Sequence, residues 1–232
     1  PMSQRPCTAR AADPSARPAP GSRSPRRWLA PLALATLLGC PSTTPEPTPA
    51  EDLPCESDSA VVELTTEDAL RLAADYLPAQ TQERAAVVLF HMIPPSNDRS
   101  TWPVRVREAL AALDVSVLTV DRRGAGDSEG EAVDAYSGPG ARLDMEAAVR
   151  FLLDEAVPCA VDAQRLVLVG ASNGTTSVMD YAAGHDATLP DPAGLVWMSP
   201  GGYTEAQNRV ADARDALEAA AMLWLYPTNE PY

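Results

Sequence analysis

The strongest constraint on the fold of this chain is a five-residue segment, Gly170-Ala171-Ser172-Asn173-Gly174. It follows an apolar run at 165–169 that is typical of a buried strand, and it precedes a predicted helix, Thr175–Ala183. A strand that turns into a helix within five residues holds its central residue in a strained backbone conformation. Glycine at both ends avoids the clash that side chains would make across so tight a turn. The segment therefore predicts that the Ser172 hydroxyl stands above the end of a sheet.

Strands and helices are predicted to alternate along the chain after residue 60. Apolar runs predict strands at Val61–Leu64, Leu70–Leu77, Ala85–His91, Val115–Val120, Leu166–Val169, Leu195–Met198 and Met222–Tyr226. Helical spacing marks three apolar faces: Val106, Ala109, Leu110 and Leu113; Met145, Ala148, Val149 and Leu152; and Val210, Ala213, Leu217, Ala220 and Ala221, the last with Thr204 as a possible N-cap. This alternation predicts an α/β fold, with a mostly parallel central sheet flanked by helices. In such sheets, functional residues gather in the loops at the carboxyl ends of the strands.

Composition separates the amino-terminal quarter from the rest. Residues 1–60 hold much of the proline, whereas the following ~170 residues suffice for one domain with a sizeable core. All 18 basic residues are arginine, and beyond Cys40 only 12 of them stand against 31 acidic residues. So acidic a body argues against nucleic-acid binding, which requires a basic surface.

The amino-terminal region has the layout of an export signal. Three arginines, at positions 23, 26 and 27, precede an apolar run at 28–38, which is too short to span a membrane. The run ends in Leu37-Leu38-Gly39-Cys40, which resembles the bacterial lipobox, and residues 41–60 have the composition of an extended tether. We therefore expect an upstream segment and lipoprotein signal at 1–40, lipidation of Cys40 and a membrane-anchored domain at 61–232. A plain cleaved signal, giving a secreted or periplasmic protein, is the alternative.

Export changes how the remaining cysteines are interpreted. Cys55 and Cys159 would reside in an oxidising compartment, where a disulfide between them is the simplest pairing. Two free thiols are the alternative. The sequence contains no Cys and His cluster with the spacing of a metal site.

Three motifs in this order make the chain resemble the α/β-hydrolase family over residues 61–232. The first is His91-Met92 at a predicted strand end, where the family usually has His-Gly. The second is 121–128, Asp-Arg-Arg-Gly-Ala-Gly-Asp-Ser, which is similar to the family's D-x-R-G-x-G-x-S loop. The third is the segment 170–174, which matches the family's G-x-S-x-G nucleophile elbow.

The resemblance implies a role for each matching residue. Ser172 would be the nucleophile, and Gly170 and Gly174 would be the glycines of the elbow. The main-chain N–H groups of Asn173 and Met92 would form the oxyanion hole. The loop at 121–128 would be structural. The implied reaction is hydrolysis of a small carboxylic ester, or with less support an amide, through an acyl-enzyme and without a cofactor.

The resemblance also requires an acid and a base after the nucleophile. Glu230 follows the last predicted strand, where the family places its acid, although an exposed turn residue is an equal alternative. The sequence has two histidines, His91 and His185, and neither lies where the family places its base. We expect a fold that lacks its carboxyl-terminal part and therefore its base. The alternative is a non-catalytic surface lipoprotein that uses a degenerate hydrolase fold to bind a ligand or partner.

Overall fold

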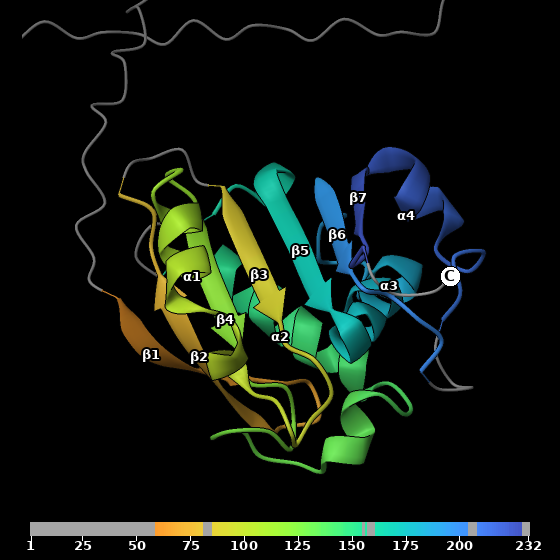
Figure 1. Cartoon of the computed structure of the whole chain (residues 1–232), viewed down its shortest axis with the longest axis horizontal. Helices are drawn as coiled ribbons and strands as arrows, with labels where there is room; N and C mark the ends of the chain where they lie inside the picture. Colours follow the sequence, from red (N-terminus) through yellow and green to blue (C-terminus); the bar gives the residue numbers. More distant parts are fainter. Residues whose placement is uncertain (1–58, 81–84, 155, 157–160, 204–207, 229–232) are drawn as a thin grey trace, which may run out of the picture. The chain divides into compact units, whose positions relative to one another are not determined.

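The computed structural model describes residues 59–80, 85–154, 156, 161–203 and 208–228 (Figure 1). The predictions for Cys40, Cys55, Cys159, Thr204 and Glu230 concern residues outside these ranges. The described strands are β1 (Ala60–Thr65), β2 (Arg71–Leu77), β3 (Ala86–Phe90), β4 (Ser116–Val120), β5 (Leu166–Ala171), β6 (Gly194–Met198) and β7 (Ala221–Leu225).

These strands form one sheet in the order β1-β2-β4-β3-β5-β6-β7. The β1–β2 and β2–β4 pairs are antiparallel, and the other four neighbouring pairs are parallel. This arrangement confirms the predicted α/β fold with a mostly parallel sheet.

Helices cover both faces of the sheet (Figure 1). Helix α1 (Val104–Ala111) lies on one face, where Val106, Leu110 and Ala111 pack against a core cluster from β3, β4 and β5. Helices α2 (Gly140–Leu153), α3 (Thr175–Gly184) and α4 (Arg214–Ala219) contribute to the larger cluster on the other face. None of the described helices is long and apolar enough to cross a membrane.

The central strands explain the continuous apolar runs of the sequence. Every side chain of β3 and of β4 is buried, because both faces of the sheet are covered at this point. In β2, by contrast, buried and partly exposed side chains alternate, as expected nearer the sheet edge. The apolar positions predicted for α2, namely Met145, Ala148, Val149 and Leu152, are all buried.

The predicted apolar face of α1 was wrong at two positions. Ala109 is exposed, and Leu113 lies beyond the helix with 72% of its surface exposed. The helix ends at Ala111, and Asp114 adopts a left-handed conformation with φ of +62°. This reversal directs the chain into β4, and it removes Leu113 from the helical face that the spacing predicted.

The last predicted helix is shorter than its apolar spacing indicated. Helix α4 covers Arg214–Ala219, and Ala213 and Leu217 are buried as predicted. Val210 precedes the helix and is exposed, so it is not part of the apolar face. Ala221 was also assigned wrongly, because its N–H donates to the Ala193 carbonyl and begins β7.

Strand β7 lies at one edge of the sheet in the described part of the chain, opposite β1, and all its side chains are exposed. It pairs in parallel register with β6, which pairs in turn with β5. Ala171 at the end of β5 pairs with Met198, and Met198 pairs with Leu225. The carboxyl end of β7 therefore lies at the same edge of the sheet as Ser172.

Candidate active site

Ser172 lies where β5 ends and a short 3-10 segment, Ser172–Gly174, leads into α3. Its φ is +48°, in the left-handed region that residues other than glycine rarely adopt. The residue is partly exposed, whereas Asn173 and Gly174 beside it are buried. The hydroxyl group is thus held at the carboxyl edge of the sheet by a strained backbone, at the start of a helix whose dipole favours negative charge.

The two glycines of this turn are required by close backbone contacts. A Cβ atom on Gly170 would lie 2.4 Å from the carbonyl oxygen of Gly174, across the turn. A Cβ atom on Gly174 would lie 2.4 Å from the carbonyl oxygen of His91 and 2.7 Å from that of Phe90. All three distances are far below van der Waals contact. The second glycine therefore lets the turn pack directly against the end of β3.

Two main-chain N–H groups lie near the turn. Phe90 pairs with Gly170 across the sheet, so Met92, just after β3, is placed beside the segment that holds Ser172. Asn173 is the second residue of the helical segment, and N–H groups in the first turn of a helix have no partner within it. Among the described residues, the Met92 N–H has no main-chain hydrogen-bond acceptor either. Both N–H groups are therefore near the turn and lack a main-chain partner among the described residues.

The sequence profile of the family described as "Serine aminopeptidase, S33" (Hydrolase_4) matches residues 81–230. The chain belongs to this family of α/β-hydrolases. No curated protein matches the sequence.

Solved structures agree with the hydrolase fold. The α/β-hydrolase GrgF from Penicillium sp. sh18 is 22% identical, with a TM-score of 0.52 over 62% of this chain and 46% of its own. DcsB, solved in complex with its substrate analogue, is 21% identical, with a TM-score of 0.51 over 62% of this chain and 46% of its own. The Pyrococcus furiosus esterase Pf2001 is 20% identical, with a TM-score of 0.52 over 74% of this chain and 71% of its own. The chain thus spans about half the length of the first two.

The first histidine of the chain, His91, has a structural role. It is fully buried, its Nε2 accepts a hydrogen bond from the main-chain N–H of Arg122 at 3.0 Å, and its Nδ1 lies 2.8 Å from the Met92 carbonyl oxygen. Since Nε2 is an acceptor, the proton of the neutral ring resides on Nδ1. Burial, and to a lesser degree the charge of Arg122, lowers the pKa of His91 to about 4. The ring therefore fixes the backbone at Met92 and cannot serve as the base of Ser172.

The second histidine of the α/β-hydrolase, His185, lies past the opposite end of α3 from Ser172. Its ring stacks on Tyr181 at a centroid distance of 4.3 Å, and its Nδ1 lies 3.0 Å from the Tyr181 carbonyl oxygen. Ten helical residues separate it from the turn, a distance of about 15 Å along the axis. Neither histidine of the sequence is therefore placed to activate Ser172. Glu230, the predicted acid, lies outside the described residues.

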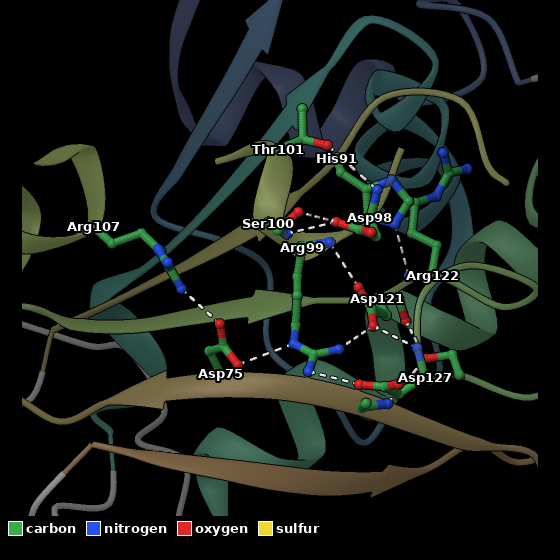
Figure 2. A network of polar contacts seen from close by, with 12 residues as sticks. Asp75, His91, Asp98, Arg99, Ser100, Thr101, Arg107, Asp121, Arg122 and Asp127 are labelled. Atoms are coloured by element: carbon green, nitrogen blue, oxygen red, sulfur yellow. Dashed lines mark hydrogen bonds and ion pairs between the residues drawn. The ribbon is translucent and has the colours of Figure 1, made fainter. Parts of the chain in front are cut away.

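The hydrolase loop at 121–128 forms a rigid support beside the site. Its Asp121 carboxylate is buried and accepts hydrogen bonds from the main-chain N–H groups of Arg99 at 2.6 Å and Asp127 at 2.9 Å, and it pairs with the Arg99 guanidinium (Figure 2). A Cβ atom on Gly126 would collide with that carboxylate. Ser128 donates to the Asp121 carbonyl oxygen at 2.7 Å. These contacts join the loop after β4 to the loop after β3.

The family resemblance implied a structural role for the whole 121–128 loop, and it did not indicate that Arg122 contacts the predicted oxyanion hole. The Arg122 guanidinium is buried and donates to the Asn173 side-chain oxygen at 2.8 Å. Two adjacent arginines one residue after a buried strand were the only signal, and this pattern does not say which arginine turns inward.

A cavity of about 380 Å³ lies between α3, β6 and β7. Met179, Trp197, Trp224 and Tyr226 line its apolar side. Thr175 also lines it, and the Thr175 hydroxyl donates to the Ser172 carbonyl oxygen at 2.6 Å, so the hollow adjoins the turn that carries Ser172. Within the described residues, no group of three or more His, Cys, Asp or Glu side chains could hold a metal ion.

Proposed function

We propose that this α/β-hydrolase cleaves a carboxylic ester through an acyl-enzyme at Ser172. The observation that carries the proposal is the left-handed backbone of Ser172 at the carboxyl edge of the sheet, beside the N–H groups of Asn173 and Met92. A strained conformation at a non-glycine residue is costly, and such residues cluster at active sites.

The proposed reaction proceeds in two halves. The Ser172 oxygen attacks the carbonyl carbon and loses its proton to a base, and the carbonyl oxygen becomes an oxyanion bound by the two N–H groups. Collapse of this intermediate expels the alcohol, which takes the proton back from the base. Water then attacks the acyl-serine by the same route, and it releases the carboxylic acid and regenerates Ser172.

The base is the missing component of this scheme. Both ring nitrogens of His91 are hydrogen-bonded to the main chain, and His185 lies past the far end of α3. We therefore propose that a histidine outside these 232 residues supplies the base and that Glu230 orients it. A chain without that histidine should react slowly, because removing a member of such a triad costs several powers of ten in rate.

An ester is proposed ahead of an amide for a chemical reason. An alcohol leaves as a weaker base than an amine, so its departure depends less on protonation by the base. The name of the matching family points to aminopeptidases, whereas the Pyrococcus furiosus structure is that of an esterase. Between β6 and β7, α4 is the one helix among the described residues, so we propose an open site that takes a small or surface-exposed substrate.

Hydrolysis assays distinguish these possibilities. We expect the chain to hydrolyse p-nitrophenyl acetate slowly, but measurably above a Ser172→Ala variant, and to leave alanine p-nitroanilide intact. Equal rates for wild type and variant would refute a nucleophilic Ser172. Faster cleavage of the anilide would show that the amide is the proper substrate.

A non-catalytic binding role is the second candidate function. It is favoured by the engagement of both histidines in structural contacts. In that case Ser172 would show no chemistry even when a base is added from solution.

We further propose that the domain is exported and anchored through lipid on Cys40. The support is the basic, apolar and Leu-Leu-Gly-Cys order of the amino-terminal region. Expression of the full chain in a bacterial host, followed by mass spectrometry, should find diacylglycerol on Cys40 and cleavage before it. A Cys40→Ser variant should remain unlipidated, and an unmodified Cys40 in the wild type would refute the anchor.

A further inference from the structure

Arg122 is the buried side chain that links the two loops of the candidate oxyanion hole. It is fully buried, and its guanidinium donates to the Asn173 side-chain oxygen at 2.8 Å and to the Met92 carbonyl oxygen at 3.4 Å. It also donates to the Ala135 carbonyl oxygen. Its main-chain N–H donates to His91 Nε2 at 3.0 Å (Figure 2). The Nδ1 of His91 in turn contacts the Met92 carbonyl oxygen. One residue thus fixes both sides of the hole.

The charge of this guanidinium has no directly paired anion among the described residues. The groups that it contacts are all neutral oxygens, and no described carboxylate forms a salt bridge with it. The neighbouring Arg123 is different, because it pairs with Asp144 at 2.8 Å and with Asp68 at 2.8 Å. Burial lowers the pKa of Arg122 to about 10, although the nearby carboxylates of Asp144 and Asp180 oppose this shift, so the group stays cationic at neutral pH. A buried cation that forms no salt bridge of its own is costly to desolvate, even with the carboxylates of Asp144 and Asp180 nearby, so its retention suggests a functional role.

We propose that Arg122 is a positioning residue of the oxyanion hole, which sets the separation of the Met92 and Asn173 N–H groups and places a fixed positive charge behind them. This inference rests on the proposed nucleophilic role of Ser172. A planar guanidinium presents several donors in a fixed geometry, so it can hold two acceptors from different loops at once. A buried charge acts in a low dielectric medium, where it favours the oxyanion more strongly than it would in water.

The test compares three variants of the full chain. Arg122→Met removes the charge and the donors, and Arg122→Lys keeps a charge but loses the planar fork. Arg123→Met is the matched control, because it removes an adjacent buried arginine that contacts neither Met92 nor Asn173. Each protein is treated with a p-nitrophenyl phosphonate in the presence of imidazole, which supplies a base. The order parameter of the Met92 amide is measured by NMR in parallel.

For Arg122→Met we expect the maximal rate of phosphonylation to fall about 100-fold, the usual effect of losing one oxyanion donor, with reagent affinity within about twofold. The Met92 order parameter should fall from about 0.85 to below about 0.6. Arg122→Lys should be intermediate in rate. If Arg122→Met fails to fold, Arg122→Lys is compared with the wild type in its place. Arg123→Met should be less stable but should match the wild type in both measurements.

A folded Arg122→Met protein that reacts at the wild-type rate, or that keeps the wild-type order parameter at Met92, overturns the proposal. A wild-type chain that is not phosphonylated at all refutes the nucleophilic role of Ser172 and, with it, this role of Arg122. The two failures are distinguishable, because only the first leaves the wild type reactive.

Discussion

The imidazole of His91 accepts a hydrogen bond from the main-chain N–H of Arg122 at 3.0 Å. This contact joins the carboxyl ends of β3 and β4 beneath the turn that carries Ser172. It also accounts for a histidine at this position that takes no part in proton transfer. The contact thus supports the site, and it also engages the ring nitrogen of His91 that would otherwise be free to accept a proton.

The His91 contact predicts a pH-dependent stability. The folded-state pKa is about 4, below the ordinary 6.5 of the unfolded chain, so the unfolded state binds more protons between these values. The contribution of neutral His91 to the free energy of unfolding is complete above pH 6.5. It decreases by up to about 3 kcal/mol as the pH falls toward 4. Urea unfolding of wild type and His91→Gln should therefore give free energies that converge as the pH falls from about 7 to about 4. Curves that stay parallel would contradict a buried neutral His91.

Backbone strain at Ser172 can be measured directly. Its φ of +48° is easily reached by glycine but is unfavourable for alanine and serine. We expect Ser172→Gly to exceed Ser172→Ala in free energy of unfolding by about 1 kcal/mol, with both variants inactive. Equal stability of the two variants in urea titrations would show that the position is unstrained.

The approach of the turn to β3 predicts that Gly174 is irreplaceable. An added Cβ atom would lie 2.4 Å from the His91 carbonyl oxygen, so we expect Gly174→Ala to lose about 3 kcal/mol or more. Gly184, at the end of α3, serves as the control, because a Cβ atom added there would have no neighbouring atom within 4 Å. Thermal unfolding should leave Gly184→Ala near the wild type. A tolerated Gly174→Ala would mean that the two loops are farther apart than described.

A base supplied from solution should rescue the reaction. If Ser172 lacks only its base, about 100 mM imidazole should accelerate the wild-type hydrolysis of p-nitrophenyl acetate about tenfold. The rate compared is that of the wild type after the rate of Ser172→Ala under the same conditions is subtracted. Sodium chloride at the same pH and ionic strength is the control. Fast hydrolysis without imidazole would instead mean that a base exists within these residues. No acceleration at all would favour the non-catalytic binding role.

The sequence predicted the features that depend on local patterns. Continuous apolar runs located β3 and β4 because strands covered on both faces are apolar throughout, and the paired glycines located the turn at Ser172 because only glycine fits there. The ends of α1 and α4 were missed, since they depend on the reversal at Asp114 and on the pairing of Ala221 with β6. Arg122 was missed because a long charged side chain at a loop can face solvent or the interior, and only tertiary contacts decide between them.

The most direct test of the central claim is reaction of the folded chain with a fluorophosphonate, followed by peptide mapping. A nucleophilic Ser172 should carry the phosphonyl group, slowly without imidazole and faster with it. The Ser172→Ala variant and the urea-unfolded wild type should remain unlabelled. Absence of the adduct from Ser172 in the presence of imidazole, or equal labelling of the unfolded chain, would contradict the account.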